Sequence, residues 1–175
     1  MKKNLSHSSV PKIVILAFII ISSTPFYSSA QSPAIKPAME KLKTGIQFEN
    51  NGQYHKAIKN YQQALALFKK LRTGDAIAVS LKRIGDVYHA LGQYEKSIEN
   101  YLQALTLFRK LGIEDAIVIT LNNIGTVYHL LGQYEKSIEN YQQALTLFRK
   151  LGKEDRVAAS LQNIGMVYDS RGQYD

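Results

Sequence analysis

Apolar residues recur at intervals of three and four over most of this chain, with polar residues between them. From residue 75 to residue 92 the pattern runs through Ile77, Leu81, Ile84, Val87, Tyr88 and Leu91. It restarts after Gly92-Gln93 and continues at Tyr94, Ile98, Tyr101, Leu102, Leu105 and Phe108. This spacing places apolar side chains on one face of a helix. It therefore predicts two amphipathic helices joined by a tight turn.

The helix pair repeats with a period of 40 residues. The stretch LGQYEKSIENY occurs at residues 91–101 and again at residues 131–141. Two glycine positions and one tyrosine position keep the same step through four copies: Gly45, Gly85, Gly125, Gly165; Gly52, Gly92, Gly132, Gly172; Tyr54, Tyr94, Tyr134, Tyr174. A fixed period of this size indicates stacked supersecondary units. We predict an all-α solenoid of antiparallel helix pairs, with units at about 38–74, 75–114, 115–154 and a partial unit at 155–175.

Two glycines in each unit have different expected roles. Gly92 fits the end of the first helix, where φ is often positive. Gly85 lies inside that helix, where glycine costs about 1 kcal/mol relative to alanine. We therefore expect the second helix to approach closely at Gly85, with Ala104 as the small residue opposite it. Tyr88 and Tyr101 are expected to fill the gap between units.

Residues 1–30 differ from the remainder. Lys2, Lys3 and Lys12 make the start basic, and residues 13–21 (IVILAFIII) are nine consecutive apolar residues. Ser28-Ser29-Ala30 supplies the small residues that a signal peptidase reads. We predict a secretory signal peptide cleaved after Ala30, in a bacterial protein exported to the periplasm or the exterior. The alternative is a retained membrane anchor, but a span needs about 20 apolar residues.

Residues 31–37 (QSPAIKP) contain two prolines and predict a flexible lead-in. Past Ala30 the chain has 19 basic and 14 acidic residues, or +5 of the total formal charge of +8. Acids such as Asp75 stand where first helices should start, and we expect Asp75 to cap its helix by accepting backbone N–H bonds. Basic residues stand where second helices should end, the order that a helix dipole favours. This favours a solvated structural role over nucleic-acid binding.

The repeated positions resemble the tetratricopeptide repeat family over about residues 38–175. The second unit carries the pattern at Leu81, Ile84, Gly85, Tyr88, Gly92, Tyr94, Ser97, Ile98, Tyr101, Ala104 and Leu105. The third unit repeats it from Leu121 to Leu145. The first unit departs at its start (Lys41, Thr44) and regains the pattern from Gly52. The resemblance implies a right-handed superhelix that binds proteins.

The chain departs from the usual family pattern in three ways. Arg109 and Arg149 stand where the family has a closing proline, so we expect the second helix to run on. Ser97 and Ser137 replace the small alanine that Ala57 keeps. The period of 40 exceeds the usual value of about 34 residues. Such units resemble those of kinesin light chains and of exported cyanobacterial proteins in which the repeats often precede a caspase-like (CHAT) peptidase domain.

In this family the first helices line a concave groove that holds a peptide or a partner's helix. The scaffold positions of this chain are copied from unit to unit, whereas the groove-facing positions vary. The candidate partner-binding residues are Lys82, Arg83, Asp86, His89, Asn122, Asn123, Thr126, His129, Gln162 and Asn163. Other groove-facing positions include Val79, Ile119 and Glu49. The alternative interpretation is that these residues are merely solvated polar residues on an exposed face.

The types of these residues suggest a ligand. Lys82-Arg83 would supply charge for an acidic group. Asn122-Asn123 can donate and accept hydrogen bonds toward a peptide backbone, and the segment TLNNIG that contains them resembles the groove helix of kinesin light chains. We predict an extended or helical peptide, possessing some acidic character, as the ligand.

No catalytic or cofactor site is recognisable. The chain has no cysteine, which excludes a disulfide framework, a thiol nucleophile and a lipid-bearing N-terminal cysteine. His89 and His129 stand one unit apart, about 10 Å between neighbouring helices, whereas a metal ligand bond is about 2 Å. Repeated glutamates such as Glu95 and Glu99 predict surface ion pairs. We expect no metal, no cofactor and no enzymatic activity.

The last five residues, RGQYD, stand where a fourth second helix would begin. Leu161, Ile164, Val167 and Tyr168 keep the interface pattern on the preceding helix. We expect this chain to be part of a longer protein, or a dimer or ligand to cover that surface. The leading hypothesis is an exported, non-enzymatic scaffold that binds a peptide or protein. The alternatives are a recruitment module of a longer enzyme, such as a CHAT-type peptidase, and a self-associating structural module.

Overall fold

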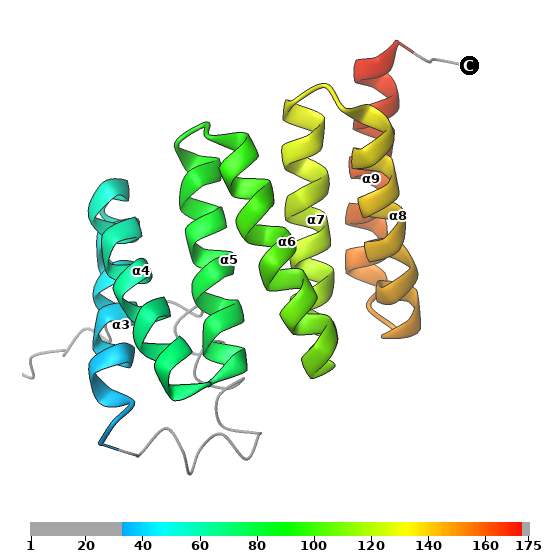
Figure 1. Cartoon of the computed structure of the whole chain (residues 1–175). Coiled ribbons are helices and arrows are strands. Elements are labelled where there is room, and N and C mark those ends of the chain that lie inside the picture. The colour runs from blue at the N-terminus through cyan, green and yellow to red at the C-terminus, as the bar shows by residue number, and fades with distance from the viewer. Residues whose placement is uncertain (1–32, 173–175) are drawn as a thin grey trace, which may run out of the picture. The chain divides into compact units, whose positions relative to one another are not determined.

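The computed structural model describes residues 33–172, and within this range the chain forms helices and no strands. The helices follow one another in antiparallel pairs (Figure 1). They are α3 (Lys36–Asn50), α4 (Tyr54–Leu71), α5 (Gly74–Ala90), α6 (Tyr94–Leu111), α7 (Glu114–Leu130), α8 (Tyr134–Lys150) and α9 (Glu154–Arg171). The prediction of an all-α array of helix pairs is confirmed. The predicted signal peptide, residues 1–30, lies outside the described residues.

Each helix packs against its neighbours in the chain, as α5 does against α4 and α6. The first helix of each pair is α3, α5, α7 or α9, and the second is α4, α6 or α8. The second helices α6 and α8 run past Arg109 and Arg149, as expected from the missing proline. No helix in residues 33–172 has both the length and the apolar character that crossing a membrane requires.

Tight turns built on glycine join the helices. Gly92 has φ +68°, a left-handed conformation that glycine adopts without a steric penalty. Its N–H donates to the carbonyl of His89 at 2.9 Å, and the Gln93 N–H donates to the carbonyl of Tyr88 at 2.9 Å. These two bonds form a Schellman motif, which satisfies the last carbonyls of the helix. The predicted role of Gly92 is confirmed.

The helix starts differ from the sequence expectation in one detail. The residue that precedes α5 is Thr73, and its side chain makes no capping hydrogen bond. Asp75 lies inside the first turn, where its Oδ1 accepts the N–H of Ala76 at 2.9 Å. Asp75 therefore accepts a backbone bond as predicted, but from within the helix, where its charge also suits the helix dipole.

The core lies between the first and second helices, and one tyrosine per unit fills it. Tyr101 is 1% exposed. A Cβ atom added at Gly85 would come within 2.7 Å of the Tyr101 ring, so the helix has glycine there to admit that ring. The atoms nearest to Gly85 thus belong to Tyr101 rather than to Ala104, which corrects the expected contact. Ser97 closes the same contact by donating to the carbonyl of Gly85 at 2.9 Å.

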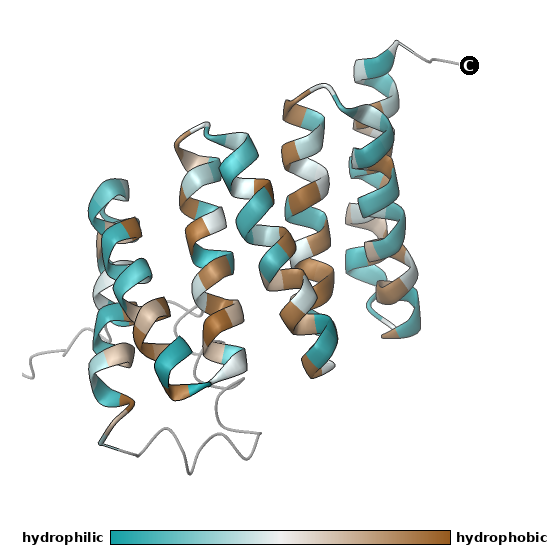
Figure 2. Cartoon of the chain, viewed as in Figure 1, coloured by the Kyte–Doolittle hydropathy of each residue, from teal (hydrophilic) through white to brown (hydrophobic). Residues whose placement is uncertain are grey.

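Apolar side chains gather on the helices that are covered on both sides. In Figure 2, α7 carries more hydrophobic positions than α8, which faces solvent on its outer side. Ile124 and Val127 of α7 are fully buried. Leu121, one turn earlier, is 1% exposed. These residues pack with Leu105 and Phe108 of α6 in one cluster, so the core is continuous across the second and third pairs.

Candidate partner-binding surface

Side chains from α5, α6 and α7 surround a small hollow on the side of the first helices. Its volume is about 110 Å³, and it is lined by Asp86, His89, Tyr101, Asn123 and Thr126. Four of these five residues were predicted from the sequence to bind a partner. We call the ten predicted residues, on α5, α7 and α9, the first-helix face.

Hydrogen bonds fix the carboxylate of Asp86 at this hollow. The Tyr101 hydroxyl donates to Asp86 Oδ1 at 2.8 Å, and Asn123 Nδ2 donates to the same oxygen at 3.2 Å. Lys82 Nζ lies 2.8 Å from Asp86 Oδ2. Three donors from three helices thus hold one carboxylate, and charge-assisted bonds of this kind are stronger than neutral ones.

Burial raises the pKa of the Tyr101 hydroxyl, and the negative charge of Asp86 together with its hydrogen bond raises it further. The hydroxyl therefore stays a proton donor at physiological pH. The same arrangement recurs in the first pair, where the Tyr61 hydroxyl donates to Glu49. Burial and Glu49 likewise raise the pKa of Tyr61. Burial raises the pKa of Tyr141, whereas its hydrogen bond with Thr126 opposes that rise.

Lys82 and Arg83, predicted to attract an acidic ligand, already have acidic neighbours. Lys82 pairs with Asp86 within α5. Arg83 Nη1 lies 3.6 Å from Glu49 Oε1 of α3. Their side chains remain 21% and 28% exposed, so a ligand carboxylate can reach them only by sharing them with Asp86 and Glu49.

The two predicted asparagines differ in their surroundings. Asn123 spans the gap to α5 through its bonds to Asp86 and to the Tyr101 hydroxyl, the latter at 3.4 Å. Asn122 turns back on its own helix, donating to the carbonyl of Val118 at 3.2 Å. The buried Oδ1 of Asn122 has no hydrogen-bond partner among the described residues. Asn123 is therefore the asparagine that the structure brings into the hollow.

The remaining predicted residues lie nearer the fourth unit. His129 Nε2 lies 2.9 Å from Ser170 Oγ of α9. Gln162 is exposed and Asn163 is half-buried, both on α9. Each pair of neighbouring first helices is therefore joined by a polar contact. The contacts are Arg83–Glu49 between α5 and α3, Asn123–Asp86 between α7 and α5, and His129–Ser170 between α7 and α9.

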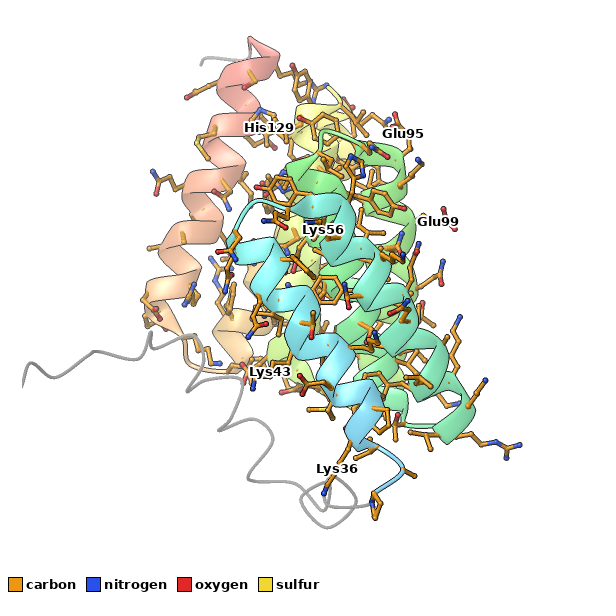
Figure 3. All side chains as sticks on the ribbon, turned by 90° about the vertical axis from the view of Figure 1, so that its left-hand side faces the viewer. Lys36, Lys43, Lys56, Glu95, Glu99 and His129 are labelled. Carbon is orange, nitrogen blue, oxygen red and sulfur yellow. The ribbon has the colours of Figure 1, made fainter. Side chains whose placement is uncertain are left out.

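Apolar side chains accompany these polar groups. Val79 on α5 is 39% exposed, and its counterpart one unit later, Ile119 on α7, is 48% exposed. In Figure 3, His129 lies on the side opposite Glu95 and Glu99, which point outward from α6. Among residues 33–172, no group of three or more His, Asp or Glu side chains is arranged to hold a metal ion.

Sequence reasoning missed the tyrosine hydroxyls. The tyrosines recur with the 40-residue period, and that regularity indicates packing, which the buried rings confirm. The hydroxyl partners Asp86 and Thr126 stand at the same position of their units but differ in residue type, and in the first unit the partner is Glu49, which stands at a different position. The period of the tyrosines alone therefore does not identify the group that each hydroxyl meets.

Comparison with known proteins identifies the repeats. The family described as Tetratricopeptide repeat matches residues 45–110 and 116–175. No curated protein matches the sequence.

Several solved structures share the fold. RapI in its apo form superposes with a TM-score of 0.75 at 22% identity, covering 91% of this chain and 44% of that one. A putative kinesin light chain from Podosopora anserina with nearly identical TPR-like repeats gives 0.68 at 17% identity, covering 92% and 76%. The TPR2AB domain of yeast Sti1, in complex with pHSP90, gives 0.64 at 25% identity, covering 78% and 48%. This chain thus spans less than half of the RapI and Sti1 chains.

Proposed function

Because the chain belongs to the tetratricopeptide repeat family, we propose that it is an exported, non-enzymatic scaffold that binds a peptide or partner protein on its first-helix face. The family is typically a protein-interaction scaffold, and the structure of Sti1 contains its partner pHSP90. The observation that carries the proposal is the hollow lined by Asp86, His89, Asn123 and Thr126. The repeat position of Asp86 varies between units whose scaffold is copied, since it holds Thr126 in the third unit and Met166 in the fourth, although His89 recurs as His129.

The groups around the hollow suit a peptide. Thr126, His89 and Asn123 offer polar atoms for a peptide backbone. Val79 and Ile119 offer exposed apolar surface nearby for a ligand side chain. A few anchoring contacts of this kind, surrounded by polar groups, provide most of the affinity in many interfaces.

We further propose that the ligand has some acidic character. Lys82 and Arg83 are the groups that would recognise it, and both remain partly exposed. Because Asp86 and Glu49 neutralise them, the preference for acidic residues is expected to be modest. Its strength decreases as salt screens the charges.

Selection from a random peptide library displayed on phage tests the binding proposal, with the full chain as bait. We expect enriched peptides whose binding falls about tenfold or more when Asn123 and Ile119 are both changed to alanine, a loss of about 1.4 kcal/mol. Glu99→Ala on the opposite side (Figure 3) is the matched control and should bind like the wild type. If the double variant binds the enriched peptides as tightly as the wild type does, the peptides do not bind on the first-helix face.

Charge reversal tests the acidic preference separately. Lys82→Glu with Arg83→Glu should weaken capture of the selected acidic peptides and leave neutral ones less affected. Unchanged capture would remove the acidic preference and leave peptide binding standing.

The proposal of export rests on the basic start, the apolar run at residues 13–21 and the small residues up to Ala30. The intact mass of the native protein from fractionated cells tests it. A protein beginning at Gln31 in the exported fraction is the expected result. A cytoplasmic protein that retains Met1–Ala30 would contradict export.

A further inference from the structure

We propose that the edge of the array where α4 leads into α5 and α6 leads into α7 is a second binding site, which docks on the surface of an anionic lipid bilayer. We call this surface the basic corner. It consists of residues 69–72 (KKLR) and 109–111 (RKL). It is separate from the first-helix face, because Asp86 lies 12 residues beyond Gly74 along α5, or about 18 Å at the rise of an α-helix.

The two segments of the basic corner lie side by side. The ends of α4 and α6 both lie at the lower edge of the array in Figure 1. A Cβ atom built on Gly74, just after the first segment, would lie 3.8 Å from the side chain of Leu111. All seven residues are exposed, and they include five basic groups and no acid. They therefore form one continuous basic surface.

Arg72 occupies a backbone position that later units give to glycine. Its φ is +54°, and Gly112 and Gly152 hold the same position with φ of +68° and +65°. A residue with a Cβ is strained in this left-handed conformation, and such strain persists mainly at functional sites. Glycine makes the same turn twice in this chain, so the turn itself does not require Arg72. The side chain of Arg72 is therefore a candidate for binding rather than for folding.

A second departure from the repeat removes an acid from the same corner. Lys150, at the end of α8, pairs with Glu114 at the start of α7 at 2.7 Å. One period earlier the counterparts are Lys110 and Gly74, so Lys110 meets no carboxylate there. The two departures, Arg72 in place of glycine and Gly74 in place of glutamate, both make this corner more positive.

Neighbouring acids leave the basic corner unneutralised. Asp75 Oδ1 accepts the backbone N–H of the next residue at 2.9 Å. Glu114 is engaged by Lys150. Asp115 is engaged by Lys153. Within residues 33–172, none of the five basic groups of the corner takes part in an ion pair, so all five can meet an external anion.

The leucines of the basic corner favour a lipid surface over nucleic acid. Leu71 is 36% exposed and Leu111 is 44% exposed. Leucines that stand beside lysines and arginines can enter the apolar boundary of a bilayer while the basic groups meet the lipid phosphates. Surfaces that bind single-stranded nucleic acid combine basic groups with aromatic side chains for stacking, and the basic corner contains no aromatic residue.

Sedimentation of the full chain with lipid vesicles tests the proposal. Vesicles of phosphatidylglycerol and phosphatidylcholine in equal parts are compared with vesicles of phosphatidylcholine alone. We expect binding to the anionic vesicles, weakened about tenfold or more by Lys69→Gln with Lys70→Gln, since each basic residue near an anionic surface contributes about fivefold. Lys56→Gln with Lys59→Gln is the matched control. It removes the same charge from the opposite end of α4 and should bind like the wild type.

Two further variants separate the basic corner from folding and from general charge. Arg72→Gly should weaken binding about fivefold, although glycine relieves the strain at this position and its urea midpoint should not fall below that of the wild type. Leu71→Ala with Leu111→Ala should weaken binding to vesicles about tenfold, because less apolar surface enters the bilayer. Every variant keeps residues 1–32, so any binding by that segment is common to all of the proteins.

Absence of binding to the anionic vesicles overturns the proposal. Equal binding by the wild type and by Lys69→Gln with Lys70→Gln also overturns it, as does equal binding to both kinds of vesicle. If the double leucine variant binds vesicles like the wild type, and a DNA duplex binds with the same dependence on Lys69 and Lys70, the corner is a site for polyanions and docking on lipid is wrong.

Discussion

At the scale of single residues, a tyrosine of each second helix links the packing to the first-helix face. The Tyr101 ring lies against Gly85, and its hydroxyl reaches Asp86 on the far side of the helix. Tyr141 does the same past Gly125 to reach Thr126. One side chain thus fills the core and also positions a group on the candidate binding surface.

The glycines that admit these rings give the first prediction. Gly125→Ala should lower the free energy of unfolding by about 1–3 kcal/mol, because its methyl group would overlap the Tyr141 ring. Gly165→Ala should raise it by up to about 1 kcal/mol, because alanine favours a helix and meets no neighbour. Urea denaturation of both variants measures the difference. Equal effects at the two positions would contradict this account.

The buried hydroxyls give a prediction about pH. Burial and nearby carboxylates raise the pKa of Tyr61 and Tyr101 above the ordinary value, which is about 10. Above that pH the unfolded chain loses these protons while the folded chain keeps them. The stabilisation is therefore complete below pH 10 and decreases as the pH rises further. The urea midpoint should fall steeply above pH 10.

Tyr101→Phe provides the control for this pH dependence. It removes one titrating hydroxyl and retains the ring that packs against Gly85. Its urea midpoint should fall less steeply above pH 10 than that of the wild type. An identical slope for both proteins would show that lysine titration, rather than Tyr101, governs the alkaline loss.

The sequence predicted the location of the candidate site more accurately than the contacts among its residues. Variation between otherwise copied units selected Asp86, Asn123 and Thr126, and these residues meet around the hollow. The pairing of Arg83 with Glu49 was not predicted, because it joins two helices whose relative placement depends on the packing between them. Asn122 was expected to face a ligand, but it bonds to its own helix.

At the scale of helices, a residue in the left-handed conformation follows the C-terminal end of each second helix. Gly112 and Gly152 follow α6 and α8 with φ of +68° and +65°. Arg72 holds the equivalent place after α4 with φ +54°. A side chain in this conformation costs of order 1 kcal/mol or more.

Arg72→Gly should therefore stabilise the protein by about 0.5–1 kcal/mol, because glycine removes the strain at a cost in chain entropy. The hydrogen bond from the residue 72 N–H to the Lys69 carbonyl, 3.2 Å long, is kept in the variant. Thermal unfolding measures the change. Arg72→Ala is the control, since alanine retains a Cβ and should give a smaller gain than glycine.

Most of the helices could be predicted because each carries its own apolar periodicity and turn signal. The end of α5 at Ala90, just before Leu91-Gly92, follows from the glycine that must adopt a positive φ. The contact at Gly85 was less predictable. A glycine in a helix shows that something approaches closely, but both Tyr101 and Ala104 lie at plausible spacing, and only the packed structure distinguishes them.

At the scale of the whole helical array, stability depends on how many neighbours cover each unit. Helices in repeat proteins contact only the adjacent helices. Among residues 33–172, α9 is covered by α8 alone, whereas α7 is covered by α6 and α8. Accordingly, α7 has seven buried residues, whereas α9 has three.

This asymmetry predicts that α9 opens before the inner helices. Local opening requires less free energy where fewer apolar contacts are broken, and Leu161 and Tyr168 of α9 are already exposed. Hydrogen exchange followed by mass spectrometry should show faster exchange over residues 154–171 than over the equivalent residues 114–130. Because α7 and α9 share the same repeat position, the comparison removes most differences in intrinsic helix propensity. Equal protection of the two helices would mean that these residues open only as a whole and that the lighter packing of α9 causes no local weakness.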